Sequence, residues 1–495
     1  MARTLSKALP SVPSSLAEVE VIDSARRGAA VAVLVRSPED DAALEPDPVS
    51  GVRPSGKAGD VRLASGPDGG VRWLAGIGTG EPKQLRGAGA ALARAADAHI
   101  AAETEAGARP PRAVRIEVGE NLRGEDVAWL VTGFLLGGYR FTVSAEPAKP
   151  GVRALHLLAP TERVAEYAEV VARVRALAEA TVLARDLANT PSNVKDPAWL
   201  AETAERVADG VPNLRVTVRD EIWLAEQGFG GVLAVGGGSA SPPRLIEAEY
   251  RPRGAKTHLL LVGKGITFDT GGLSIKPADG MHLMRTDMAG GAAVIAAVRA
   301  IASLRLGVRV TALVPAAENH VSGGAYRPGD VVRHYGGRTT EVANTDAEGR
   351  MVLADALVYG IRRFKPDAVV DAATLTGAMK VALGLRTGAL FANDDDLAER
   401  VLAAGGDAGE AWWRMPLLDA HADAVRGELG DVTQAPSGPG GITAALFLRE
   451  FVDGVPWAHL DIAGPARADK NYAEVVPGAT GFAARTLVEL AASYA

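Results

Sequence analysis

Short apolar runs alternate with longer amphipathic stretches along most of the chain. Within the first third, five runs have the length and apolar content of strands: residues 17–22, 29–35, 71–78, 113–118 and 154–159. Two stretches between them, 83–98 and 125–139, carry apolar residues at helical spacing. This alternation predicts a small α/β domain. Nothing in it assembles a set of chemical groups.

A long stretch at 161–189 has apolar residues at helical spacing and few helix breakers, which predicts a connecting helix. We place the domain boundary near residue 170. The sequence thus predicts an N-terminal domain over 1–170, ending in this linker helix, and a larger catalytic domain over 171–495. The stretch 40–60 is rich in Asp, Pro and Gly and predicts an exposed loop.

The same alternation resumes in the second part of the chain. Strands are predicted at 214–218, 257–263, 308–315, 367–375 and 457–464, and helices at 291–304, 351–364 and 442–453. We therefore predict two α/β domains, each with a mostly parallel or mixed sheet flanked by helices. In such sheets, sites form beyond the carboxyl ends of the strands, so the larger domain is where a site is expected.

Composition narrows the class of protein. The chain has 495 residues, of which 47% are hydrophobic, and this is more apolar material than a single core usually holds. A net charge of -7 argues against a nucleic-acid partner. No cysteine is present, which excludes disulfides, thiolate metal sites and cysteine nucleophiles. The first 30 residues lack the apolar core of a secretory signal, and no apolar run matches a membrane span. We expect a soluble, cytoplasmic protein.

Two segments, 259–294 and 344–357, place charged side chains after predicted strands or before a predicted helix. They hold four carboxylates, two lysines and an arginine: Lys264, Asp269, Lys276, Asp287, Asp346, Glu348 and Arg350. Carboxylates within ~4–6 Å of one another disfavour each other's ionisation. Two divalent cations would offset four negative charges, and oxygen ligands suit Mg, Mn or Zn. The clustering favours metal-assisted hydrolysis.

Other interpretations of these residues stay open at this point. Each acid alone is typical of a solvated loop or a helix cap, and residues 263–272 could form a turn or a phosphate cradle. That stretch lacks the spacing of a Walker A loop or a dinucleotide fingerprint. The eight histidines are scattered without an H-E-x-x-H pattern, which argues against a histidine zincin. No G-x-S-x-G elbow is present either.

Four stretches carry a resemblance to a known family. GKGITFDTGGLSIKP, MRTDMAGGAAV, NTDAEGRMVLADAL and ATLTGA closely resemble signatures of the leucyl (cytosol) aminopeptidase family, and the similarity spans about 185–465. The resemblance implies a metal-dependent hydrolase, a protease that removes the N-terminal residue from peptides with a free N-terminus. It further implies a preference for leucine or other apolar residues, a role in intracellular peptide turnover, and a homo-hexamer.

The resemblance also implies roles for individual residues. Two divalent ions, Mn²⁺ or Zn²⁺, would be held by five ligands: Lys264, Asp269, Asp287, Asp346 and Glu348. Of these, Asp269 and Glu348 would bridge the ions, and Lys264 would bind as a neutral amine. The catalytic pair would be Lys276, a donor to the oxyanion, and Arg350, which would hold a bicarbonate ion. Residues near the substrate side chain would include Met284, Thr374 and Gly377. One departure is Ala289, where many members have glycine.

Three rival functions remain to be weighed. A binding protein could keep this scaffold without turnover, although every expected polar residue is present. Some members of the family also bind DNA as regulators, and salt-dependent retention on duplex DNA would reveal that role. Metal-dependent phosphoester hydrolysis shares the two-metal logic, but the motifs offer no further Arg or Lys clamps.

Overall fold

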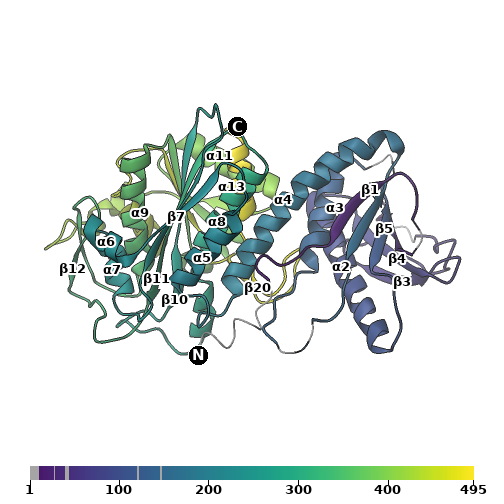
Figure 1. Cartoon of the computed structure of the whole chain (residues 1–495), viewed down its shortest axis with the longest axis horizontal. Coiled ribbons are helices and arrows are strands. Elements are labelled where there is room, and N and C mark those ends of the chain that lie inside the picture. The colour runs from purple at the N-terminus through teal and green to yellow at the C-terminus, as the bar shows by residue number, and fades with distance from the viewer. Residues whose placement is uncertain (1–10, 27, 39–43, 120–121, 145, 147) are drawn as a thin grey trace. The chain divides into compact units, whose positions relative to one another are not determined.

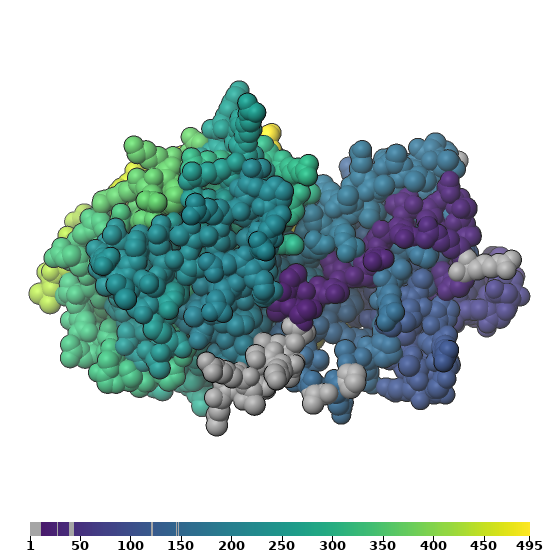
Figure 2. Space-filling view, in the orientation of Figure 1, coloured from purple at the N-terminus to yellow at the C-terminus, as the bar shows by residue number. Residues whose placement is uncertain are grey.

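The contacts of the chain divide it into two compact units. The smaller unit comprises Ser14–Val182 and Asp469–Pro477, and the larger comprises Leu183–Ala468 and Gly478–Ala495 with residues 11–13. The computed structural model describes residues 11–26, 28–38, 44–119, 122–144, 146 and 148–495. Colours follow the chain in Figures 1 and 2, so the smaller unit is mainly purple and blue.

The division between the units falls within one long helix, α4 (Val164–Asn189), which follows the short 3₁₀ turn η1 (Thr161–Arg163). The boundary predicted near residue 170 lies in this same helix. Of the loop predicted at 40–60, residues 40–43 lie outside the described residues. Residues 44–60 form no helix or strand.

The smaller unit is built on a six-stranded sheet with the order β1-β6-β5-β2-β4-β3. All its pairs are parallel except β3 with β4. Its strands are β1 (Glu18–Ile22), β2 (Ala30–Arg36), β3 (Val61–Ser65), β4 (Val71–Gly78), β5 (Ala113–Glu117) and β6 (Ala154–Leu158). The sequence predicted all of these except β3, a mostly exposed edge strand whose residues lack an apolar run.

Two helices of the smaller unit, α2 (Pro82–Glu105) and α3 (Gly124–Gly137), pack with their backbones in close approach. A Cβ added at Gly133 would lie 2.0 Å from the carbonyl oxygen of Arg86. A Cβ added at Gly89 would lie 2.1 Å from the carbonyl oxygen of Leu130. Only glycine fits at these two points, because the atoms that would clash belong to the backbone and cannot rotate away.

Replacing Gly133 with alanine should destabilise the smaller unit by about 3 kcal/mol, the upper range for overpacking, since a helix must shift. Gly87→Ala is the matched control on α2, because a Cβ there meets nothing within 4 Å. That control should be neutral or stabilising by up to about 1 kcal/mol. Denaturant unfolding followed by tryptophan fluorescence measures both. Equal midpoints for the two variants would contradict the close approach of α2 and α3.

The larger unit contains a nine-stranded mixed sheet with the order β16-β15-β18-β14-β9-β11-β8-β7, to which β10 adds by pairing with β11. Its central pairs are parallel, whereas β8 runs antiparallel to both of its neighbours and β15 runs antiparallel to β18 but parallel to β16. The strands are β7 (Leu214–Arg219), β8 (Arg244–Tyr250), β9 (His258–Gly263), β10 (Gly265–Asp269), β11 (Arg309–Asn319), β14 (Ala368–Ala373), β15 (Thr387–Ala392), β16 (Ala411–Arg414) and β18 (Trp457–Asp461). The mixed sheets flanked by helices confirm the predicted fold class.

Helices cover this sheet and short strands extend the loops around it (Figure 1). The helices are α5 (Pro197–Ala208), α6 (Glu221–Gln227), α7 (Gly230–Gly236), α8 (Ala289–Ser303), α9 (Glu348–Phe364), α10 (Gly377–Leu383), α11 (Asp395–Ala408), α12 (Gly440–Arg449) and α13 (Ala484–Ala492), with 3₁₀ turns η2 (Met281–Thr286) and η3 (Asp419–Val425). The short strands are β12 (Val331–Arg333), β13 (Thr339–Glu341) and β17 (Val432–Thr433), which form one sheet. The predicted helix at 442–453 is wrong at its end, because α12 stops at Arg449.

One stretch of the described residues, Met281–Ser303, has the length and hydropathy of a membrane-spanning helix, but 89% of its apolar window is buried in the protein. It contains η2 and α8. A Cβ added at Gly290 on α8 would lie 2.0 Å from the carbonyl oxygen of Ala372 on β14. This stretch is apolar because its helix packs directly on the central sheet.

A hairpin-like excursion interrupts the larger unit near its end. The strands β19 (Arg467–Ala468) and β20 (Gly478–Ala479) pair antiparallel, and the residues between them, Asp469–Pro477, belong to the smaller unit. There the buried carboxylate of Glu474 lies 3.4 Å from Arg86 Nε. The Arg94 guanidinium donates a hydrogen bond to the carbonyl oxygen of Ala473 at 3.1 Å.

Candidate active site

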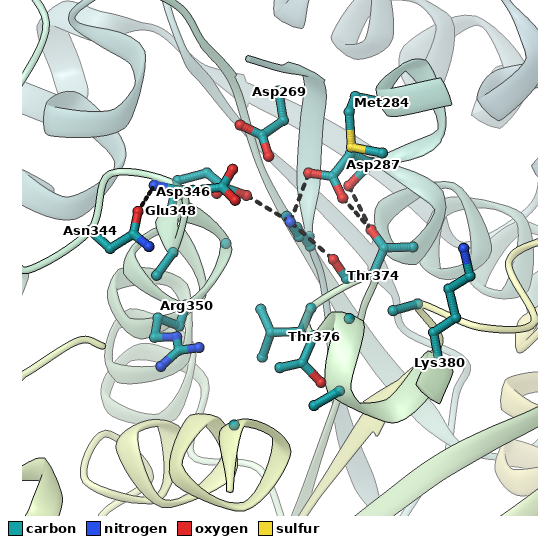
Figure 3. A pocket seen from close by; sticks show the side chains of 18 of the residues that line it. Asp269, Met284, Asp287, Asn344, Asp346, Glu348, Arg350, Thr374, Thr376 and Lys380 are labelled. Atoms are coloured by element: carbon teal, nitrogen blue, oxygen red, sulfur yellow. Dashed lines mark hydrogen bonds and ion pairs between the residues drawn. The ribbon is translucent and has the colours of Figure 1, made fainter. Parts of the chain in front are cut away.

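The charged residues from the two sequence segments converge at the carboxyl edge of the central strands. Lys264 directly follows β9, and its N–H donates to the carbonyl oxygen of Ala372 on β14 at 3.0 Å. Asp269 is the last residue of β10, and Glu348 is the first residue of α9. Together they line a pocket of about 530 Å³ (Figure 3). The site lies where parallel strands end, as the sequence predicted.

Lys264 is almost fully buried, with its side chain 3% exposed. Its ammonium lies 2.7 Å from Asp287 Oδ2 and 2.7 Å from Glu348 Oε1. Burial alone would lower the pKa of Lys264, but the charges of these carboxylates outweigh it and hold the pKa above its ordinary value. The side chain packs on Gly349, where an added Cβ would lie 2.6 Å from Lys264 Cε.

Lys276 is more open to the pocket, with 21% of its side chain exposed. Its ammonium lies 2.8 Å from Asp269 Oδ2 and also contacts the carboxylate of Asp346. Burial opposes the charge here too, yet the neighbouring carboxylates raise the pKa of Lys276. Each lysine therefore lies between two carboxylates, and the two lysines differ mainly in burial.

The carboxylates are crowded. One oxygen atom from each of Asp269, Asp346 and Glu348 lies within 4.8 Å of the others. Burial, followed by repulsion from Asp269, raises the pKa of Glu348 to about 8. Burial also raises the pKa of Asp287 to about 6 and that of Asp346 above its usual range. The two ammonium groups do not offset the negative charge that this arrangement concentrates.

Two oxygen atoms of the cluster support the fit to a metal. Asp287 Oδ2 and Asp346 Oδ1 are buried, and each lies against a positively charged group, the Lys264 ammonium at 2.7 Å and the Lys276 ammonium respectively. Buried carboxylate oxygens are costly without a partner, and a cation is one that suits them. A donor set of carboxylate oxygens with an amine, and no thiolate or imidazole, fits hard or borderline divalent ions.

Arg350 lies on α9, on the opposite side of the pocket from Met284 and Lys380 (Figure 3). Its guanidinium donates a hydrogen bond to the carbonyl oxygen of Gln434. Burial lowers the pKa of Arg350 to about 10, against the opposing attraction of Glu348. The side chain thus stays charged at neutral pH and can hold an anion, but it cannot take up a proton.

Asn319 is a site residue that the sequence analysis missed. Its side-chain N–H₂ donates to Asp269 Oδ1 at 2.8 Å and to the carbonyl oxygen of Thr345 at 3.0 Å. It thereby fixes the loop of Asp269 relative to the loop of Asp346. Asn319 is the last residue of β11 and lies four residues beyond the end of the strand predicted at 308–315. If the strand had been predicted at its full length, Asn319 would have been placed at its carboxyl end, where the site was expected.

Asp461, at the end of β18, was also missed. Its carboxylate accepts hydrogen bonds from the N–H groups of Leu375 and Thr376, at 3.2 and 3.0 Å, and from the Thr376 hydroxyl at 2.5 Å. These bonds fix the loop after β14. In that loop Thr374 Oγ1 donates to Asp287 Oδ1 at 2.7 Å. The predicted strand at 367–375 is too long, because β14 ends at Ala373 and this loop begins there.

The residues expected near the substrate side chain, Met284, Thr374 and Gly377, all line the pocket. So do two cations that no sequence motif indicated, Lys380 and Arg467. Their presence removes the sequence argument against phosphoester hydrolysis, which rested on a lack of further basic side chains. Similarity to known proteins decides between the two reactions.

Comparison with known proteins gives consistent results. The pattern described as "Cytosol aminopeptidase family, catalytic domain" matches residues 182–488. A probable cytosol aminopeptidase of Roseiflexus castenholzii is 49% identical over 373 residues, covering 74% of this chain and 76% of its own. One from Desulfovibrio desulfuricans is 42% identical over 450 residues, covering 88% and 89%.

A solved structure, the bottromycin maturation enzyme BotP in complex with Mn, superposes with a TM-score of 0.83 at 40% identity, covering 94% of this chain and 99% of that one. With the clustered carboxylates, these matches define a metal-dependent peptide hydrolase. The chain belongs to the cytosol aminopeptidase family. It is an aminopeptidase.

Proposed function

We propose that this chain is a two-metal aminopeptidase that removes the N-terminal residue, preferably leucine or another apolar residue, from peptides in the cytoplasm. The observation that carries the proposal is the pocket in which four carboxylates surround the ammonium groups of one buried and one half-buried lysine. Its role would be intracellular peptide turnover. The family resemblance supports a homo-hexamer as its assembly.

Five residues would hold the two divalent ions: Lys264, Asp269, Asp287, Asp346 and Glu348. Lys264 would bind as the neutral amine, since a dication displaces its proton. When bound, the ions supply an activated water and polarise the scissile carbonyl. Mn²⁺ or Zn²⁺ suits this donor set, and the Mn in the structure of BotP supports the former.

The remaining polar groups would act on the substrate directly. Lys276, charged because neighbouring carboxylates raise its pKa, would donate a hydrogen bond to the oxyanion that develops on the scissile carbonyl. Arg350 would hold a bicarbonate ion, which would supply the proton acceptor that the charged guanidinium cannot be. Apolar lining by Met284, Leu375 and Ala463 would accommodate the first side chain.

Metal removal tests this proposal. Chelated protein should be inactive towards chromogenic amino-acid anilides, because the carboxylate cluster alone cannot activate water. Activity should return when Mn²⁺ or Zn²⁺ is added, with about two ions bound per chain by elemental analysis. Full activity in protein that contains no stoichiometric divalent metal would refute the two-metal mechanism.

A further inference from the structure

Two basic side chains outside the carboxylate cluster line the pocket. Lys380 on α10 lies on the same side as Met284 and Thr374, opposite Arg350 (Figure 3). Arg467, the first residue of β19, lines the pocket as well. Neither belongs to the carboxylate cluster, so their charges serve a different purpose from those of Lys264 and Lys276.

The ammonium group of Lys380 is available to a ligand. Lys380 is exposed, and across the described ranges of the chain its side chain makes no ion pair or hydrogen bond. A third cation, Arg285, lies near enough to Arg467 for the two charges to repel. Its guanidinium donates to the carbonyl oxygen of His282 at 3.1 Å. Lys380, Arg467 and Arg285 thus place three cationic side chains in or near the pocket.

The wall beside these cations is apolar and small. It is formed by Met284, Ala463 and Ala466, and the nearby Thr374 hydroxyl already donates to Asp287. A short aliphatic side chain of the substrate would pack on this wall. A carboxylate at its end would then lie near Lys380 and Arg467, and would not be buried against apolar groups without a partner. Glutamate is the amino acid that combines these two features.

Resting on the proposed function, we propose that the pocket accepts an acidic first residue, and that Lys380 and Arg467 select N-terminal glutamate over uncharged glutamine. The apolar wall takes the methylene groups of the side chain. The carboxylate then pairs with the two cations. Leucine stays a substrate through the same wall, whereas glutamate gains an ionic contact that glutamine lacks.

Hydrolysis of glutamyl, glutaminyl and leucyl anilides by the metal-loaded enzyme tests the proposal. The kcat/KM ratio of glutamyl to glutaminyl substrate should exceed one. It should fall about tenfold in Lys380→Gln or Arg467→Gln, the usual effect of losing a hydrogen bond to a charged group. Lys256→Gln is the matched control, because Lys256 is exposed and lies outside the pocket. Its ratio should equal that of the wild type.

Binding of the free amino acids gives a second readout that does not need turnover. Glutamate should bind the metal-loaded protein more tightly than glutamine by calorimetry, and the difference should shrink as salt is raised. If the protein binds glutamate more tightly than glutamine but hydrolyses none of the substrates, the proposed function is wrong and this inference stands. If the protein cleaves leucyl anilide but shows no preference for glutamate in either assay, the proposed function stands and this inference is wrong. Discrimination of leucyl-glutamate from leucyl-glutamine instead would place the acidic residue second and overturn the proposal.

Discussion

Lys276→Ala should lower kcat by about 10²–10³-fold while the protein keeps near-normal metal content. The reason is that Lys276 opens towards the pocket, where it can donate to an oxyanion, and removal of one oxyanion donor typically has an effect of this size. Arg350→Ala should behave similarly, because its guanidinium also acts on the bound anion and not on the metals. Elemental analysis and single-substrate kinetics on the same preparations measure both quantities.

Lys264→Ala provides the contrast. This side chain is 3% exposed and lies between Asp287 and Glu348, so its loss removes a proposed metal ligand and leaves two carboxylates facing each other. Metal affinity and activity should fall together. Metal loss in Lys276→Ala, or intact metal and activity in Lys264→Ala, would show that the roles of the two lysines are assigned wrongly.

Peptides with an acetylated N-terminus should resist hydrolysis altogether, whereas the same peptides with a free amine are cleaved. The pocket concentrates carboxylates where the amine would enter, and an acetyl group removes the basic nitrogen while adding bulk. An N-methylated peptide is the informative control because it keeps a basic nitrogen and adds a single methyl group. It should retain part of the activity. Turnover of acetylated and free peptides at similar rates would exclude recognition of the amine.

Much of the fold was predictable because its central elements have strong local patterns. The strands β9, β11 and β14 are buried on both faces and appear in the sequence as apolar runs. The helices α8 and α9 appear as stretches whose apolar residues recur at helical spacing. The edge strand β3 was missed because edge strands need few apolar residues. The strand β8, also missed, alternates apolar and acidic residues although it is largely buried. Its buried Glu247 pairs with Arg219 at 2.9 Å, and no local pattern predicts such a pair.

The charged site residues were predictable for a different reason. They gather in two short segments beside glycines, so sequence proximity already brings most of them together. Residues such as Asp461, Gln434 and Arg467 come from separate segments and join the site only because the chain returns to it. The side chains of Asp461 and Gln434 make hydrogen bonds to backbone groups of other loops. Such contacts depend on tertiary structure and leave no signature in a single sequence.

The excursion at Asp469–Pro477 has a consequence for how the protein is made. The smaller unit is encoded first, yet one buried charged contact, Glu474 with Arg86, comes from the end of the chain. At ~5–20 residues per second, synthesis needs about 15–60 s to reach that segment after Val182. During this interval the nascent smaller unit can form its sheet and helices but lacks its last piece. The smaller unit is therefore completed only after most of the larger unit has been synthesised.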